Sequence, residues 1–347
     1  MVAISLLTLV PGHVGGSETY ARELIAALAR ARYPFRVVAP PAVTGLPAET
    51  SVEVAAEYGA PSGTARRLAA MSRAAVDPRL RRRFARDDVV HFPLTVALPP
   101  VRKRTVVSVM DLQHVDLPQL FGRADRAYRA VAYHGSARRA ERVITISAFV
   151  RQRAIDALGL DPERVVVAPL AVDHARFTPT GEPREPFLLY PARAWPHKNH
   201  ARLFEAFALL RRDRPELRLL LTGGGAFPAL PEGVEALGLV STDELVSLYR
   251  RAAALVFPSL YEGFGQPPIE AMACGCPVAC SDVAALPEVV GDAARLFDPN
   301  DARAIADAVA DVLAAPEGWV ERGLRRAAEF SWDATARVHM DVYGALL

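Results

Sequence analysis

The stretch Tyr261–Pro277, YEGFGQPPIEAMACGCP, holds two carboxylates eight positions apart, Glu262 and Glu270. Two glycines between them allow sharp turns and close backbone approach to a ligand. Two prolines follow, which suit the first turn of a helix but not its interior. The pattern predicts a helix that begins near Pro268 and ends at Gly275. Glu262 is therefore expected on a loop, and Glu270 in the first turn of a helix whose free N–H groups suit a phosphate.

Outward from this stretch, apolar strand candidates alternate with helix candidates along the chain. The strands lack polar alternation, which is typical of a parallel sheet covered by helices on both faces. The expected strands are residues 2–10, 35–39, 51–55, 88–92, 105–110, 142–147, 164–169, 187–192, 217–225, 254–259 and 277–281. Expected helices include three capped by Ser17, Ser147 and Asn199, a long one over about 123–141 and a last one from about Trp332. Residues 111–121 are expected to form a loop.

The run EGFGQPPIEAMACGCPV resembles the signature of the retaining glycosyltransferases of family four, with its Glu–seven residues–Glu spacing intact. The resemblance covers essentially the whole chain and is firmer after Phe187. It implies the fold called GT-B, an α/β fold in which two Rossmann-like doubly wound parallel-sheet domains face each other across a cleft. It also implies that the C-terminal helix crosses back to the first domain.

The chain has 347 residues, a length that suits two domains. Residues 170–186 are rich in proline and charge and show no periodicity, so the link between the domains is placed there. We expect an N-terminal acceptor domain over 1–175, which the helix 332–347 rejoins. A nucleotide-sugar donor domain is expected over 187–331, after a linker over 176–186.

Two cations follow the strand that opens the second half: Arg193 and Lys198, in YPARAWPHKNH. Arg–five residues–Lys resembles the family's diphosphate clamp. Departure of a nucleoside diphosphate builds negative charge on the leaving oxygen, which two fixed cations can stabilise without a metal. No cofactor and no metal are therefore expected.

The remaining donor contacts are implied by the resemblance. Glu270 would accept hydrogen bonds from the ribose hydroxyls. Glu262 would lie near the transferred sugar, whose hydroxyls the N–H groups of Gly263, Phe264 and Gly265 would reach. Gly223 ends another strand of the second half, and Val240 and Leu245 resemble the edge of the base pocket. In the first half, Gly15 and Gly16 could bind the same phosphates through backbone N–H groups; a tight strand-to-helix turn is the alternative.

The segment VMDLQHVDLPQLF departs from the family pattern. Related enzymes commonly carry His-Asp where this chain has Met110 and Asp111, and that histidine is expected to contact the sugar near its 6-hydroxyl. Met110 cannot make this polar contact. Either His114 takes over the role or the donor sugar lacks a hydroxyl at C6, as in a 6-deoxyhexose; a core methionine without a role is a third alternative.

Net charge is +2, yet residues 66–142 hold seventeen Arg and Lys against seven Asp and Glu, so the rest of the chain is acidic. RLRRRFAR (79–86) and VRKR (101–104) are the densest parts. They could be solvated helix faces or a surface that meets anionic lipid headgroups. Nucleic acid is not expected, since no aromatic residues interleave the arginines.

The cysteines, Cys274, Cys276 and Cys280, are too close together for disulfides and too few for a zinc site, which favours a reducing cytosol. The sequence thus predicts a cytoplasmic enzyme, which could be peripheral at the inner membrane face. It would move a sugar, from a GDP-mannose-like or 6-deoxyhexose donor, to a hydroxyl of a glycan, lipid-linked saccharide or small-molecule acceptor. The alternatives are an epimerase or phosphorylase of similar architecture, an oxidoreductase, which the missing G-x-G-x-x-G disfavours, and a non-catalytic basic docking module.

Overall fold

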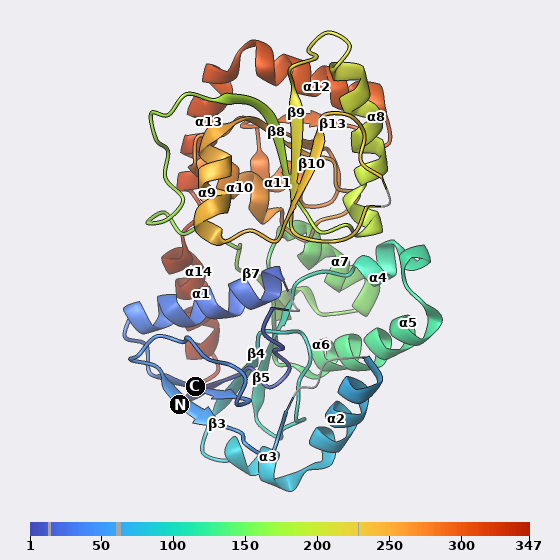
Figure 1. The fold of residues 1–347 in the computed structure, drawn as a ribbon. Helices are drawn as coiled ribbons and strands as arrows, with labels where there is room; N and C mark the ends of the chain where they lie inside the picture. Colours follow the sequence, from blue (N-terminus) through green and yellow to red (C-terminus); the bar gives the residue numbers. More distant parts are fainter. Residues whose placement is uncertain (13–14, 60–63, 228) are drawn as a thin grey trace. The chain divides into compact units, whose positions relative to one another are not determined.

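The computed structural model describes residues 1–12, 15–59, 64–227 and 229–347. The chain divides into two compact units, Met1–Leu170 with Trp332–Leu347 and Ala171–Ser331. Each unit is an α/β domain built on one parallel sheet (Figure 1). The expected fold class, two doubly wound parallel-sheet domains, is confirmed.

The first unit contains a seven-stranded sheet in the order β3-β2-β1-β4-β5-β6-β7. Its strands are β1 Val2–Ser5, β2 Phe35–Ala39, β3 Ser51–Val54, β4 Val89–Phe92, β5 Arg104–Val109, β6 Arg142–Thr145 and β7 Val165–Val167. Its helices are α1 Gly16–Arg30, α2 Thr64–Val76, α3 Pro78–Arg83, α4 Gln113–Asp116, α5 Arg123–Arg129, α6 Gly135–Arg139, α7 Ala148–Leu158 and α14 Trp332–Gly344. Short 3-10 turns cover Pro118–Leu120 and Pro162–Arg164, and a π-helical turn covers Ala130–His134.

The second unit contains a six-stranded sheet in the order β10-β9-β8-β11-β12-β13. Its strands are β8 Glu185–Pro191, β9 Arg218–Thr222, β10 Val234–Gly238, β11 Ala252–Phe257, β12 Val278–Ser281 and β13 Arg295–Phe297. Its helices are α8 His200–Leu210, α9 Thr242–Arg251, α10 Gln266–Ala273, α11 Leu286–Val290, α12 Ala302–Ala314 and α13 Pro316–Ala328, with a 3-10 turn at Pro196–Lys198. In both sheets the strand order reverses beside the first strand of the unit, between β1 and β4 and between β8 and β11.

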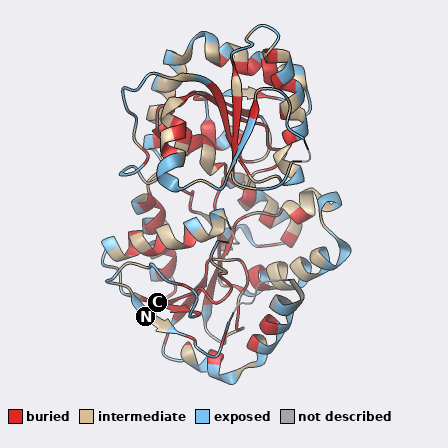
Figure 2. Ribbon diagram, viewed as in Figure 1, coloured by how far each residue is buried: buried red, intermediate tan, exposed pale blue. Residues whose placement is uncertain are grey.

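Burial follows the pattern of a doubly wound sheet. The central strands of both units are buried on both faces, and the exposed residues lie on helices, on outer loops and on the edge strands β3 and β10 (Figure 2). This explains why the central strands could be predicted from continuous apolar runs. The edge strand β10, VEALG, was not predicted, because it holds a single β-branched residue beside alanine, glutamate and glycine, which are depleted in strands.

Three local predictions are wrong. Ser17 does not cap the first helix, which begins at Gly16 after an N-cap at Gly15 with φ 54° and no side-chain cap. Asn199 precedes α8 but makes no cap bond, because its side-chain amide donates instead to the carbonyls of Pro258 and Pro299 at 3.1 and 2.7 Å. Residues 111–121 are not a simple loop but contain α4 and a 3-10 turn.

The link between the units lies at the start of the expected stretch 170–186 and before the narrower linker expected over 176–186. The boundary falls between Leu170 and Ala171, and residues 176–186 are part of the second unit. Phe177 is buried there with its ring 6.3 Å from that of Tyr249. Arg250 also donates to the carbonyl and hydroxyl of Thr178, at 2.7 Å each. These contacts hold the proline-rich segment against α9, although its sequence has no helical or strand periodicity.

The final helix, α14, joins the first unit through a chain of hydrogen bonds between buried side chains. Consecutive members lie 2.7 to 2.8 Å apart, in the order Tyr343, His91, Ser108, Tyr20 and His339. All five are fully buried. This series of hydrogen bonds connects α14 to α1 and to strands β4 and β5.

Each bond of this chain has a defined direction when both histidines are neutral. His339 Nδ1 lies 2.7 Å from the carbonyl oxygen of Thr335, which only accepts, so Nδ1 carries the proton and Nε2 accepts from the Tyr20 hydroxyl. Tyr20 then accepts from Ser108, and Ser108 from His91 Nε2–H. The Tyr343 hydroxyl donates to His91 Nδ1. Protonation of either imidazole would break this order.

Acid is therefore expected to destabilise the first unit through His339. Burial lowers the pKa of His339 to about 4, and that of His91 falls well below 6.5 through burial and through His339. Because the folded-state pKa is depressed, the stabilisation is present above the unfolded-state value near 6.5 and is lost as the pH falls toward 4. A shift of this size corresponds to on the order of 3 kcal/mol.

The free energy of unfolding, measured with urea from pH 7 to pH 4, should fall more steeply in the wild type than in His339→Gln. His174→Gln is the matched control, since His174 is exposed, and its slope should equal that of the wild type. An equal dependence of the unfolding free energy on pH in the wild type and in His339→Gln would contradict the assignment of the acid destabilisation to His339.

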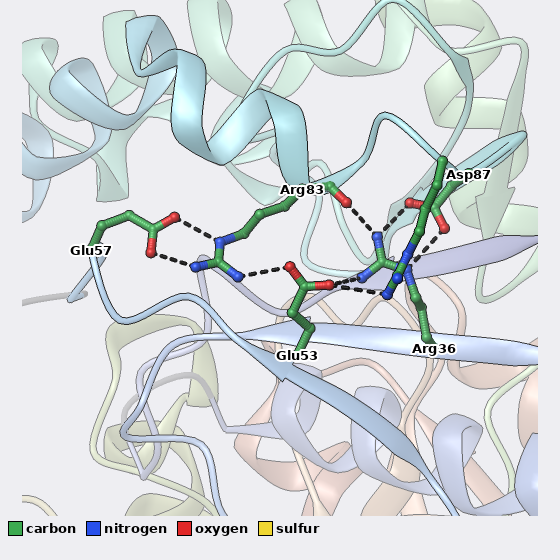
Figure 3. Close-up of polar contacts among 6 residues, drawn as sticks. Arg36, Glu53, Glu57, Arg83 and Asp87 are labelled. Atoms are coloured by element: carbon green, nitrogen blue, oxygen red, sulfur yellow. Dashed lines mark hydrogen bonds and ion pairs between the residues drawn. The ribbon is translucent and has the colours of Figure 1, made fainter.

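A second polar network fixes the edge of the first sheet (Figure 3). Arg36 on β2, only 2% exposed, bonds the fully buried Asp87 in a bidentate pair, with Nε–Oδ1 2.9 Å and Nη2–Oδ2 2.6 Å. Arg36 Nη1 also bonds Glu53 on β3 at 2.8 Å. Arg83 on α3 bridges the other Glu53 oxygen to Glu57. Part of the basic segment 79–86 is thus used inside the fold and not at the surface.

Candidate functional site

The candidate site of the second unit lies at the carboxyl ends of β8 and β11, where the strand order reverses. Ligands of doubly wound sheets bind at this point because the loops from the two strands separate there. The loop after β8 carries Arg193 and Lys198, and the loop after β11 carries Glu262. Residues 64 positions apart in the sequence therefore meet at one place.

Lys198 and Glu262 form an ion pair, with Nζ and Oε1 2.5 Å apart and each side chain 14% exposed. The Lys198 ammonium also lies 5.4 Å from the centre of the Phe257 ring. The lysine main chain is fixed from behind, because the hydroxyl of the buried Tyr190 donates to its carbonyl at 2.6 Å. The Ala285 N–H donates to the Glu262 carbonyl at 3.3 Å. Both charges are thus held by the main chain as well as by each other.

Arg193 lies half-buried on the same loop, with its guanidinium 5.5 Å from the ring centre of Trp195. The loop packs directly on Gly223, at the end of β9. Gly223 has φ 104°, and a Cβ there would lie 2.8 Å from the carbonyl carbon of Ala192. Glycine is required at this position so that the Arg193 loop can approach β9. The role predicted for Gly223, contact with the donor, is not tested by this packing.

Glu270 lies on α10, but in its second turn and not in the first as predicted, because the helix begins at Gln266 and not at Pro268. Its Oε2 accepts a hydrogen bond from the Tyr249 hydroxyl at 3.1 Å, and Gln266 is a second donor. Burial raises the pKa of Glu270 to about 7, against the lowering effect of these two hydrogen bonds. Near neutral pH the group therefore exchanges between carboxyl and carboxylate.

The loop before α10 is shaped by Gly265, which has φ 105°. A Cβ at this residue would lie 2.5 Å from Cδ2 of Leu286. Phe264 is buried, with its ring 5.6 Å from that of Phe330, so its backbone and not its side chain is what the loop offers to a ligand. Gly263 and Glu262 are partly exposed beside it.

Val240 and Leu245 lie on either side of the start of α9, and both are partly exposed. Ser241 caps this helix by accepting from the Glu244 N–H at 3.1 Å. The neighbouring Leu239 is 77% exposed. A base pocket at these residues remains a prediction.

The other predicted site residues belong to the first unit and are described within it. Gly15 and Gly16 lie at the N-terminus of α1, where the positive φ of Gly15 favours glycine and a Cβ on either residue would meet no atom within 4 Å. Asp111 follows β5, and its Oδ1 accepts from the N–H of Gln113 at 3.1 Å. Neither observation distinguishes a phosphate site from a tight turn.

His114 is buried on α4, with its Nε2 2.8 Å from Nε2 of His134. Burial, with Arg129 and His134 nearby, lowers the pKa of His114 to about 4, so the imidazole is neutral at physiological pH. Its Nδ1 is buried and has no hydrogen-bond partner among the described residues. Met110 is also buried, 8% exposed. Whether His114 or Met110 faces the donor sugar stays a prediction.

Sequence reasoning missed the residues that support the site. Tyr190 and Tyr249 are fully buried and direct their hydroxyls to Lys198 and Glu270. A tyrosine inside an otherwise apolar strand or helix face was the available signal, because a buried tyrosine hydroxyl needs a partner. His134, the partner of His114, lies in the π-helical turn. No residue pattern in the sequence predicted this turn.

Among the described residues, no group of three or more His, Cys, Asp and Glu is placed to hold a metal ion. The three cysteines are buried and unbonded to one another. No helix in the described part of the chain is long and apolar enough to span a bilayer.

Comparison with known proteins identifies the family of the chain. Residues 173–327 match the family described as Glycosyl transferases group 1, and residues 14–176 match Glycosyltransferase Family 4. The chain is 32% identical over 293 residues to O-antigen chain mannosyltransferase B of Escherichia coli, covering 75% of each chain. It is 29% identical over 226 residues to O-antigen chain mannosyltransferase RfbU of Salmonella typhimurium, covering 63% of each.

A solved structure, sucrose-phosphate synthase from Thermosynechococcus elongatus, superposes with a TM-score of 0.79 at 21% identity, over 99% of this chain and 98% of that one. This likeness concerns the fold alone. Fold, site and relatives together define the protein as a glycosyltransferase. More specifically, the chain belongs to glycosyltransferase family 4.

Proposed function

We propose that the protein is a retaining, metal-independent hexosyltransferase that moves mannose from GDP-mannose to a hydroxyl of a growing polysaccharide. The observation that carries this proposal is the placement of Lys198 and Glu262 at the point where the strand order reverses, 2.5 Å apart. One cation for a diphosphate and one carboxylate for sugar hydroxyls occupy the position where a doubly wound sheet binds its ligand.

In the proposed reaction, Lys198 and Arg193 stabilise the charge that develops on the departing diphosphate. Their positions are fixed before the reaction, by Tyr190 behind Lys198 and by the packing of the Arg193 loop on Gly223. Such preorganised charge lowers the barrier without further rearrangement. Glu270 binds the ribose hydroxyls, and Glu262 accepts hydrogen bonds from the transferred sugar. The acceptor attacks from the face that the diphosphate leaves, and a diphosphate oxygen takes its proton.

Mannose is proposed because the relatives reported above are named as O-antigen chain mannosyltransferases. A 6-deoxyhexose is the second candidate, since the buried Met110 offers no hydrogen bond to a 6-hydroxyl. GDP-mannose and GDP-fucose separate these candidates, because the first carries the 6-hydroxyl and the second does not.

Thermal unfolding with a panel of ligands tests the donor. GDP-mannose at 100 times its dissociation constant should stabilise the protein by about 2.7 kcal/mol in the presence of EDTA. GDP-fucose, UDP-glucose and NADH should have smaller effects. Because a carboxylate accepts two hydrogen bonds and a carboxyl fewer, affinity should fall as the pH drops below about 7, the pKa of Glu270. Stabilisation by NADH alone, or by no nucleotide sugar, would refute the proposal.

A peripheral position at the inner face of the cytoplasmic membrane is proposed for the first unit, where a lipid-linked saccharide would be the acceptor. The two densest basic segments lie side by side in this unit and form a hollow of about 510 Å³. Its lining residues are Arg81, Phe84, Ala85, Pro100, Val101, Arg102 and Lys103, with no carboxylate among them. Cations beside an apolar wall suit an anionic lipid headgroup.

Vesicles test this contact. Replacing Arg102 and Lys103 by glutamine should weaken binding to vesicles that contain phosphatidylglycerol by about thirtyfold, since each basic residue near an anionic surface contributes about 1 kcal/mol. The double variant Arg212→Gln/Arg303→Gln removes the same charge from two exposed positions of the second unit, in the turn after α8 and on α12, and should bind like the wild type. Equal loss in both variants, or no binding by the wild type, would contradict a specific surface.

A further inference from the structure

The Lys198–Glu262 ion pair affects which ligand the site binds more tightly. The single ammonium of Lys198 is paired with Glu262 in the structure, at 2.5 Å and with both side chains 14% exposed. Any diphosphate that binds Lys198 must share this cation with the Glu262 carboxylate or take it away. Two anions, the Glu262 carboxylate and the diphosphate, then compete for Lys198 in a site where water screens charges only in part.

The main chain of Glu262 cannot withdraw from such a diphosphate, so its carboxylate moves only by rotation of the side chain. Its main-chain carbonyl is bonded by the Ala285 N–H. The loop that follows turns at Gly265, which packs closely on Leu286. Glu262 therefore stays near the phosphates whenever Lys198 turns to them, and its charge must be compensated by another donor of hydrogen bonds.

We propose that Glu262 makes the site select the intact sugar nucleotide over the spent nucleoside diphosphate; this inference rests on the function proposed above. An intact donor brings sugar hydroxyls, which donate hydrogen bonds to Glu262 and replace the contact it loses. A nucleoside diphosphate brings no such donors and carries more negative charge on its terminal phosphate. It leaves Glu262 unpaired beside an anion, so the leaving group is rejected after transfer.

Glutamine at position 262 isolates this effect, because it keeps the size of the side chain and removes its charge. Glu262→Gln should bind inorganic pyrophosphate and GDP about tenfold more tightly than the wild type, as expected when one like charge nearby is removed. GDP-mannose should bind the variant no more tightly than the wild type, because the lost carboxylate was its hydroxyl acceptor. The ratio of the GDP and GDP-mannose dissociation constants should therefore fall about tenfold or more.

Titration calorimetry with pyrophosphate, GDP and GDP-mannose in EDTA measures all three constants. Glu205→Gln is the matched control: Glu205 lies in the same unit and also pairs with a cation, Arg202 at 2.5 Å, but its side chain is 56% exposed. Its three constants should equal those of the wild type. If Glu262→Gln does not fold, Glu262→Asp, which lengthens the contact to Lys198, should move the ratio in the same direction by a smaller factor.

The outcomes separate this inference from the proposed function. If GDP-mannose binds the wild type and is turned over, but Glu262→Gln changes all three constants by the same factor or none, selection by Glu262 is overturned and the enzyme assignment stands. If no sugar nucleotide binds the wild type, the proposed function fails and this inference fails with it. A selective gain for pyrophosphate and GDP supports the inference.

Discussion

Replacing Lys198 by alanine should lower the rate of sugar transfer by a factor of about 10²–10³, by analogy with the loss of one fixed donor to a developing anion. The effect is large because Lys198 is one of two cations on the loop after β8 and is held rigidly by Tyr190. The loss should appear in kcat as well as in kcat/KM, since charge on the leaving oxygen grows toward the transition state.

Arg193→Ala should show a loss of the same order, and the two can be measured in one assay of mannose transfer from GDP-mannose. Both variants should keep a single cooperative thermal transition, which shows that the fold is intact. Arg202→Ala is the control, because Arg202 is in the same unit and its side chain is 40% exposed in an ion pair on α8. Wild-type turnover in both Lys198→Ala and Arg193→Ala would disprove the clamp.

The largest expected effect on stability comes from Asp87→Ala. Asp87 is fully buried and forms the bidentate pair with Arg36, which is 2% exposed (Figure 3). Removing the carboxylate leaves a buried guanidinium with only Glu53 and the Arg83 carbonyl as partners. Breaking a buried pair from one side costs about 3–5 kcal/mol. Urea unfolding at pH 7 measures this difference.

Two further variants identify the cause of that loss. Arg36→Met/Asp87→Leu removes both charges and should recover most of the stability, because apolar replacements of a buried pair are often neutral. Asp333→Ala breaks the exposed Arg30–Asp333 pair, at 56% and 64% exposure, and should cost less than about 1 kcal/mol. A loss below about 1 kcal/mol for Asp87→Ala would show that the buried pair is not a main support of the sheet edge.

The fold could be predicted from the sequence because its central strands are buried on both faces and read as continuous apolar runs. Of the two partly exposed edge strands, β3 was predicted and β10 was not. The presence of a helix could be predicted more reliably than the residue and the capping contact at which it begins. At Ser17 and Asn199 the usual capping residue is present, but the backbone conformation of Gly15 and the bonds of Asn199 to two distant carbonyls decide the local structure.

For the site, the sequence predicted which residues follow the carboxyl ends of the strands but not how they pair. Lys198 and Glu262 were assigned separate partners, a diphosphate and a sugar, whereas the structure pairs them with each other. This contact forms because β8 and β11 are neighbours in the sheet. The spacing of residues along the sequence does not show which strands are neighbours. The same holds for the His114–His134 contact, which depends on a π-helical turn.

The place of α14 in the first unit bears on the order in which the protein folds during synthesis. Residues 171–331 form a contiguous unit, whereas the first unit includes Trp332–Leu347 at its core. The ribosome, at about 5–20 residues per second, needs roughly 10–30 s to make the second unit after the first sheet has emerged. Through that interval Tyr20 and His91 lack their partners on the last helix, His339 and Tyr343. The nascent chain therefore completes its second unit before its first.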